Sequence, residues 1–263
     1  MEKVYSQPEY YEIAFSFRDL GHEVATLAEL ARRHSTIPVT HVLEIACGNS
    51  PHLAELAKHG FTYTGIDRNE VMLGAARQRA GSLGVDARLV RADLANFDLP
   101  ERVDFAFVLL GSLYVTSNEE LRSHFDAMGR ALRPGGLYVL DWCVDFIPAI
   151  DIWDTWDAER GGVRVKASYK SVSVNRAQQV YRETLTLEVD DHGRQMTFME
   201  VALKRAIYPQ EFLLFLDERP DFEFVGWWDD WDLEQPIDNA QTVTRPVIAV
   251  RRTATGSGPR PVS

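Results

Sequence analysis

Cysteine is scarce in this chain. Of its 263 residues only Cys47 and Cys143 are cysteines, and these two form neither a disulfide framework nor a recognisable set of metal ligands. We therefore expect no metal site and interpret both thiols as small buried groups in a reducing compartment. The cytoplasm is the expected location.

Long apolar runs are also missing. The longest, Phe105–Val115, is interrupted by Gly111 and Ser112 and is shorter than the roughly 20 residues that cross a bilayer. The first ten residues contain no apolar segment typical of a secretion signal. We expect no membrane partner.

Dense clusters of basic residues are absent as well. The chain has 28 Lys and Arg against 39 Asp and Glu, which gives a net charge of −11. A protein that binds the phosphates of a nucleic acid needs a basic face, so this balance argues against a nucleic-acid partner. It favours a neutral or cationic small molecule.

The most informative segment that is present runs from residue 42 to residue 51 and reads V-L-E-I-A-C-G-N-S-P. Its apolar start predicts a buried parallel strand, and Ala46 and Gly48 allow a ligand to approach the backbone. Ser50 and Pro51 favour the start of a helix that we predict over Pro51–His59.

A second strand is predicted to end at Asp67, which follows Gly48 at the spacing of a ribose-binding carboxylate. This pairing indicates a Rossmann-type nucleoside site. Pro51 offers no backbone N–H to a pyrophosphate, and Glu44 places negative charge beside the turn. Both features suit a ligand with an ammonium group better than a dinucleotide.

Four motifs in order resemble those of the class I S-adenosylmethionine (SAM)-dependent methyltransferases. They are Glu44–Ser50, Arg91–Leu94, Val103–Leu110 and Leu132–Asp141. The family's turn is usually E/D-x-G-x-G-x-G, and here Ala46, Gly48 and Ser50 occupy the glycine positions, so only the central glycine is kept. The resemblance implies SAM as the cofactor and S-adenosylhomocysteine as the product, without a metal.

The resemblance also implies roles for individual residues. Asp67 is expected at the ribose, Asp93 at the adenine amino group with the backbone of Leu94 at the ring, and the backbone of Leu109 at the methionine amino group. The remaining residues of the predicted cofactor site are Arg18, Glu44, Ala46, Gly48, Arg68 and Met72. Arg18 and Tyr11 belong to an N-terminal segment that we expect to lean over the cofactor.

The predicted fold is α/β, a Rossmann-like, doubly wound and mostly parallel seven-stranded sheet with a reversed last hairpin. To it we add an N-terminal helical cap and an antiparallel β insertion, since three Val-, Thr- and Tyr-rich stretches lie between Gly162 and Ile207. The predicted units are a cap (1–36), a SAM-binding core (37–145), a lid insertion (146–208), a C-terminal helix and hairpin (209–252) and a disordered tail (253–263).

Catalytic residues are harder to name, because an in-line methyl transfer depends mainly on positioning and an amine acceptor needs no strong general base. Tyr11, Tyr114 and Asp145 are the candidates, the last two because they lie beyond the carboxyl ends of predicted strands. The aromatic and acidic segment Trp227–Asp232 has two interpretations. It could receive a cationic amine, or its tryptophans could pack the end of a strand.

We therefore expect a methyltransferase that acts on an N or O nucleophile of a small metabolite. Its layout is similar to that of amino-sugar N-methyltransferases. A non-catalytic SAM-binding module or partner subunit is the alternative, and a nicotinamide-dependent oxidoreductase would require Pro51 to stand at a pyrophosphate site. The strand edges of the insertion also make a homodimer plausible.

Overall fold

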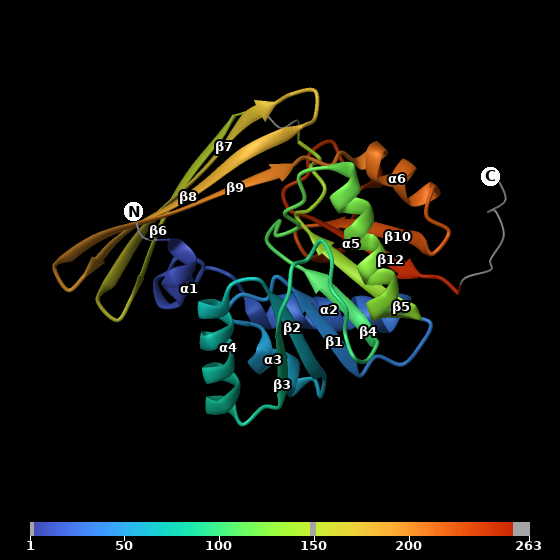
Figure 1. Cartoon of the computed structure of the whole chain (residues 1–263), viewed down its shortest axis with the longest axis horizontal. Coiled ribbons are helices and arrows are strands. Elements are labelled where there is room, and N and C mark those ends of the chain that lie inside the picture. Colours follow the sequence, from blue (N-terminus) through green and yellow to red (C-terminus); the bar gives the residue numbers. More distant parts are fainter. Residues whose placement is uncertain (1–2, 148–150, 255–263) are drawn as a thin grey trace.

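The computed structural model describes residues 3–147 and 151–254. The predicted disordered tail, 253–263, lies outside these ranges except for Thr253 and Ala254. Within them the chain folds into a large sheet with helices on both faces and a separate, smaller antiparallel sheet that extends to one side (Figure 1).

The larger sheet has eight strands within the described ranges, in the order β11-β10-β12-β5-β4-β1-β2-β3. The strands are β1 (His41–Ile45), β2 (Thr62–Asp67), β3 (Ala87–Arg91), β4 (Val103–Val108), β5 (Leu132–Asp141), β10 (Phe222–Asp229), β11 (Asp232–Pro236) and β12 (Pro246–Arg252). Neighbouring strands in the stretch β5-β4-β1-β2-β3 of this order pair in parallel. By contrast, β12 is antiparallel to both of its neighbours, β5 and β10. The predicted doubly wound sheet with a reversed last hairpin is confirmed, with β11 as an additional short edge strand.

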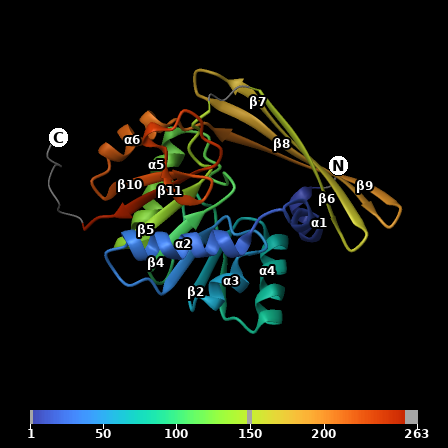
Figure 2. The ribbon, with the colours of Figure 1, turned by 180° about the vertical axis from the view of Figure 1, so that it is seen from behind.

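Both faces of this sheet are buried. Along β4, Phe105 and Phe107 belong to the apolar core on one face, and Ala106 and Val108 to the core on the other, as the alternation of side chains along a strand requires. The helices α2 (Leu20–His34), α3 (Leu53–Lys58) and α4 (Glu70–Leu83) contribute to the first face, and α5 (Asn118–Ala131) and α6 (Pro209–Asp217) to the second (Figure 2). Among the described helices, none is both long and apolar enough to span a bilayer.

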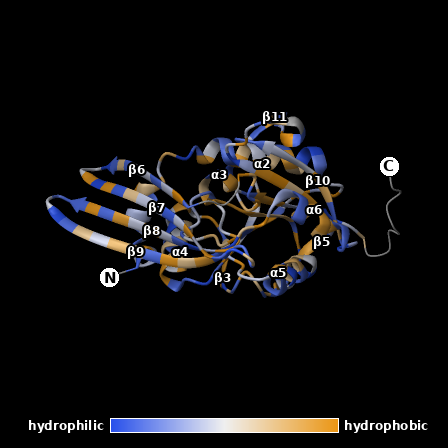
Figure 3. Cartoon of the chain, turned by 90° about the horizontal axis from the view of Figure 1, so that it is seen from above, coloured by the Kyte–Doolittle hydropathy of each residue, from blue (hydrophilic) through white to orange (hydrophobic). Residues whose placement is uncertain are grey.

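The smaller sheet is an antiparallel meander. Its strands are β6 (Ile152–Arg160), β7 (Val163–Asn175), β8 (Val180–Asp191) and β9 (Arg194–Arg205), in that order. The predicted antiparallel insertion is confirmed, but β6 was not predicted. It is an exposed edge strand rich in Asp, Glu and Trp, so it lacks the apolar alternation by which a strand is found in a sequence. Hydrophilic and hydrophobic residues alternate along the other strands (Figure 3).

The N-terminal cap consists of η1 (Val4–Ser6), α1 (Pro8–Ala14) and α2. The first two elements pack on the small sheet, where Val4, Ile13 and Ala14 share an apolar cluster with residues of β7, β8 and β9, among them Leu187. The indole N–H of Trp156 donates to the carbonyl of Ala14 at 2.7 Å. The N-terminal segment therefore helps to hold the small sheet to the core domain, together with direct contacts such as the hydrogen bond from the Arg205 N–H to the Val115 carbonyl at 2.7 Å.

This packing predicts the cost of truncating Leu187. Its side chain is fully buried, and Leu187→Ala is expected to lower the free energy of unfolding by about 2–5 kcal/mol. The matched control is Leu203→Ala on the neighbouring strand, where the side chain is 45% exposed and the expected loss is below about 1 kcal/mol. Urea denaturation measures both, and equal losses would contradict this account of the cap.

Candidate active site

The turn after β1 has an unusual backbone. Ala46, Gly48 and Ser50 all have positive φ, at 53°, 53° and 51°, which costs free energy at the two residues that are not glycine. A Cβ on Gly48 would lie 3.4 Å from the Met72 side chain. That distance is ordinary van der Waals contact, so the positive φ, and not a lack of space, is what favours glycine at the centre of this tight turn.

The helix after this turn begins later than predicted. α3 starts at Leu53 rather than at Pro51, and Ser50 does not cap it. The Oγ of Ser50 is fully buried and lies 2.8 Å from the Tyr63 hydroxyl. The left-handed backbone at Ser50 and this buried contact explain why the prediction of an N-cap was wrong.

Asp67 ends β2 and faces the turn. One carboxylate oxygen accepts a hydrogen bond from the backbone N–H of Gly48 at 2.9 Å, and the other accepts from that of Asn69 at 2.7 Å. Burial raises the pKa of Asp67, although these two donors oppose the shift. Each carboxylate oxygen has two lone pairs, so the group retains capacity for two further donors.

The other predicted cofactor residues are spread along the same edge of the sheet. Asp93 is exposed and accepts from the backbone N–H of Ala95 at 2.8 Å, so one of its oxygens caps the next turn. The carbonyl of Leu94 lies 2.7 Å from Nδ1 of His124. The carbonyl of Leu109 accepts from the N–H of Ser112. Arg68 is exposed after Asp67.

Glu44 and Arg18 lie in the interior. The carboxylate of Glu44 accepts from the Tyr63 hydroxyl at 2.5 Å and lies 2.8 Å from Nδ1 of His52. Arg18 forms a salt bridge with Glu23 at 2.5 Å, and its side chain is 5% exposed. The contacts that the structure gives these two predicted cofactor residues are with other side chains beneath the turn.

These groups belong to a buried charge cluster, which we define by the residues Arg18, Glu23, Glu44, His52, Asp141 and Arg245. Within it, the Glu23 carboxylate lies 3.0 Å from His52 Nε2 and 3.1 Å from the Arg245 guanidinium. The Arg245 guanidinium in turn lies 2.7 Å from the Asp141 carboxylate. Burial would lower the pKa of His52, but Glu44 and Glu23 raise it. With His52 protonated, three positive and three negative charges balance.

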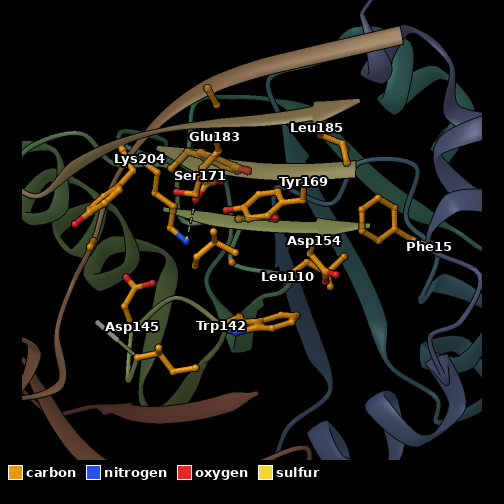
Figure 4. Close-up of a pocket in the computed structure, with 18 of the residues that line it drawn as sticks. Phe15, Leu110, Trp142, Asp145, Asp154, Tyr169, Ser171, Glu183, Leu185 and Lys204 are labelled. Carbon is orange, nitrogen blue, oxygen red and sulfur yellow. Dashed lines mark ion pairs between the residues drawn. The ribbon is translucent and has the colours of Figure 1, made fainter. Parts of the chain in front are cut away.

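A cavity of about 690 Å³ lies beyond the carboxyl ends of β4 and β5, between the cap and one face of the small sheet (Figure 4). All three predicted catalytic residues, Tyr11, Tyr114 and Asp145, line it. The other lining residues used below are Leu110, Gly111, Ser112, Trp142, Asp154, Asp157, Tyr169, Ser171, Glu183, Glu200 and Lys204.

The lining is mostly aromatic and acidic. Burial raises the pKa of Tyr11 to about 12 and that of Tyr114 well above its usual value, so both phenols stay protonated at neutral pH. Asp145 accepts from the N–H of Ile207 at 3.1 Å, and burial raises its pKa while the Lys204 ammonium opposes the shift. Asp145 is the best placed of the three to accept a proton.

Several lining residues were not predicted. Ser171, Glu183, Glu200 and Lys204 project from β7, β8 and β9 into the cavity, and no sequence motif marks them. By contrast, Trp227, Trp228 and Trp231 are buried and do not line the cavity. This placement favours the interpretation of the segment Trp227–Asp232 as strand packing.

Comparison with known proteins agrees with this geometry. Residues 42–136 match the family model described as a methyltransferase domain. This part of the chain is therefore similar to a methyltransferase domain. The predicted resemblance is thereby confirmed for this part of the chain.

Relatives and solved structures of similar fold extend the comparison. A Streptomyces fradiae dTDP-3-amino-3,6-dideoxy-α-D-glucopyranose N,N-dimethyltransferase is 30% identical over 125 residues, 47% of each chain, so the chain spans about half the length of such curated relatives. Streptomyces venezuelae DesVI has a TM-score of 0.75 at 21% identity, over 94% of this chain and 99% of that one. The SAM-bound amino pentose methyltransferase CalS10 of Micromonospora echinaspora has a TM-score of 0.71 at 22% identity, over 92% and 96%. The similarity of fold to these two structures covers most of the chain and so extends beyond residues 42–136.

The buried charge cluster predicts a pH dependence of stability. Burial alone would raise the pKa of Glu23, but hydrogen bonds from His52 and Arg18 lower it from 4.5 to about 2. A carboxylate with a lowered pKa stabilises the fold fully above its unfolded pKa, and this contribution is lost as the pH falls from 4.5 towards 2. Glu23→Gln should therefore cost on the order of 3 kcal/mol near neutral pH and progressively less in that window.

The control for this prediction is Glu29→Gln, on the same helix. Glu29 also has a lowered pKa through Arg32 and Arg33, but its ion pairs lie at the surface, where water screens them. Unfolding free energies of both variants and the parent chain, measured from pH 2 to pH 8, separate the two cases. An equal pH dependence for both variants would contradict the role of Glu23.

Proposed function

We propose that the chain is a SAM-dependent methyltransferase that acts on an amine nitrogen of a small molecule. The observation that carries this proposal is the acidic, aromatic cavity at the carboxyl ends of β4 and β5, where ligands bind in open α/β sheets. The relatives named above support it, because they are named as methyltransferases of amino sugars.

The residues at the edge of the sheet fit an S-adenosyl group. Asp67 retains acceptor capacity for the ribose hydroxyls, and the tight turn at Ala46 and Gly48 leaves backbone accessible to a ligand. We assign Asp93 and Leu94 to the adenine. When bound, SAM supplies an electrophilic methyl group on a sulfonium.

The other predicted cofactor residues take supporting positions in this proposal. Leu109 leads from β4 into the loop that faces the cavity, and we assign its backbone to the methionine end. Arg68 and Met72 flank the ribose site. Glu44 and Arg18 act from below through the buried charge cluster, which holds the turn and the cap in place.

The cavity residues then position the acceptor. The protein encloses the amine between the cap and the small sheet and so excludes water, and alignment supplies much of the rate. The amine must be unprotonated before it can accept the methyl group that bound SAM would supply, and we propose Asp145 as the base that takes the amine proton. Tyr11 and Tyr114, as protonated phenols, would donate hydrogen bonds.

Charge in the cavity favours an amine over an anionic acceptor. Among the lining residues that the structure describes, Asp145, Asp154, Asp157, Glu183 and Glu200 are acidic and only Lys204 is basic. Such a surface attracts a protonated amine before it loses its proton. We further propose that the protein acts in the cytoplasm, without a nucleic-acid or membrane partner. The strand edges of the small sheet make a homodimer plausible.

Turnover with matched acceptors tests the proposed function. We expect S-adenosylhomocysteine to form from SAM and 3-amino-3-deoxy sugars, supplied as methyl glycosides and as dTDP derivatives, and not from the same sugars with a hydroxyl in place of the amine. Asp67→Ala should weaken S-adenosylhomocysteine binding at least about 10-fold, since it removes a charged acceptor. The exposed Asp86→Ala is its control.

Each contrary result has a distinct meaning. Binding of SAM with no turnover of any acceptor would support a non-catalytic module. Turnover of only the hydroxyl analogues would identify an O-methyltransferase, and binding of NAD in place of SAM would overturn the cofactor assignment.

A further inference from the structure

Lys204 is the one basic residue among the described residues that line the cavity. It lies near the end of β9, is 8% exposed, and points into the cavity (Figure 4). Its Nζ lies 4.0 Å from the Glu183 carboxylate, and among the described residues it donates no hydrogen bond. An ammonium has three donors, and this one faces the cavity, so it can donate hydrogen bonds to a ligand bound there.

The pairing of the small sheet explains this placement. Glu183 on β8 lies opposite Ala202 on β9 and Ser171 on β7. Lys204 follows Ala202 by two residues and so lies on the same face, diagonal to Glu183, within reach of a long side chain. A carboxylate and an ammonium are therefore held side by side on rigid strands.

The core domain closes the same space from the other side. A Cβ on Gly111 would lie 3.2 Å from Nζ of Lys204, so the ammonium sits beside the loop that follows β4. Asp145 faces the same part of the cavity (Figure 4). This is the loop that the proposed function assigns to the methionine end of the cofactor.

The charges around Lys204 determine what it can bind. Burial would lower the pKa of Lys204, but Glu183 and Asp145 raise it above its ordinary value, so the ammonium is charged. Two carboxylates against one ammonium leave the group negative, which disfavours an anionic ligand. A hydroxyl accepts from an ammonium and donates to a carboxylate at once, so it complements both kinds of group.

We propose that Lys204, Glu183 and Asp145 form a specificity subsite for an uncharged hydroxyl group of the acceptor, which makes the preferred acceptor a hydroxylated amine. This inference rests on the proposed function and names its substrate class. An acceptor without that hydroxyl would leave buried polar groups unpaired, and for this reason the site would discriminate against it.

The experiment uses methyl 3-amino-3-deoxy-α-D-glucopyranoside and its 2-deoxy, 4-deoxy and 6-deoxy analogues as probes. For the parent chain we expect kcat/KM to fall at least about 10-fold for one analogue. In Lys204→Met the fall in kcat/KM for that analogue should shrink to below about 3-fold, while the Kd for S-adenosylhomocysteine stays unchanged. Glu183→Gln should reduce the same discrimination and provides a second variant if Lys204→Met does not fold.

The matched control is Lys170→Met. Lys170 is exposed on β7 over the Trp153 ring and does not line the cavity. Its substitution should therefore leave the discrimination between the probes intact. Unaltered discrimination in Lys204→Met would overturn the subsite, and so would a large rise in the Kd for S-adenosylhomocysteine, which would place Lys204 at the cofactor.

Binding separates this proposal from the proposed function. Calorimetry of the four probes against the complex with S-adenosylhomocysteine needs no turnover. Binding that depends on one hydroxyl and on Lys204, without methylation, would support the subsite and overturn the methyltransferase activity. Methylation of all four probes with equal kcat/KM would support the methyltransferase activity and overturn the subsite.

Discussion

The buried carboxylate of Asp141 is the constraint on which the site depends. It ends β5, is fully buried, and accepts hydrogen bonds from the Arg245 guanidinium at 2.7 and 2.9 Å and from the backbone N–H of Leu110 at 2.9 Å. Leu110 has a positive φ, and this bond holds its strained backbone where the cavity begins. Through Glu23, Arg245 also connects Asp141 to the cap. Asp141 and its partner Arg245 thus connect the start of the reversed last strand, the loop after β4 and the N-terminal helices.

The division of labour between the two sheets follows from this arrangement. The large sheet carries the motifs that can be recognised locally, and it presents Asp67 and the tight turn at its carboxyl edge. The small sheet supplies side chains such as Glu183 and Lys204, which define the chemistry of the cavity. A fold of this kind can therefore keep one cofactor site while the acceptor changes with the inserted strands.

How much was predictable from sequence depends on whether a feature is local. Asp67 could be placed because it ends a predicted strand at a set distance from Gly48. The parallel sheet could be predicted because strands and helices alternate. The start of α3 could not be predicted, since the left-handed backbone of Ser50 is set by a buried contact with Tyr63. Lys204 was missed for a different reason. Its approach to Glu183 depends on the register of β8 and β9, which the sequence pattern does not determine.

A crystal structure of the chain with S-adenosylhomocysteine tests the central claim most directly, namely that the edge of the large sheet and the cavity form one continuous site. We predict that both ribose hydroxyls will donate to Asp67 and that the sulfur will face the cavity beside Leu110–Ser112. A nucleoside bound elsewhere, or a sulfur that points away from the cavity lined by Tyr114 and Asp145, would contradict the account.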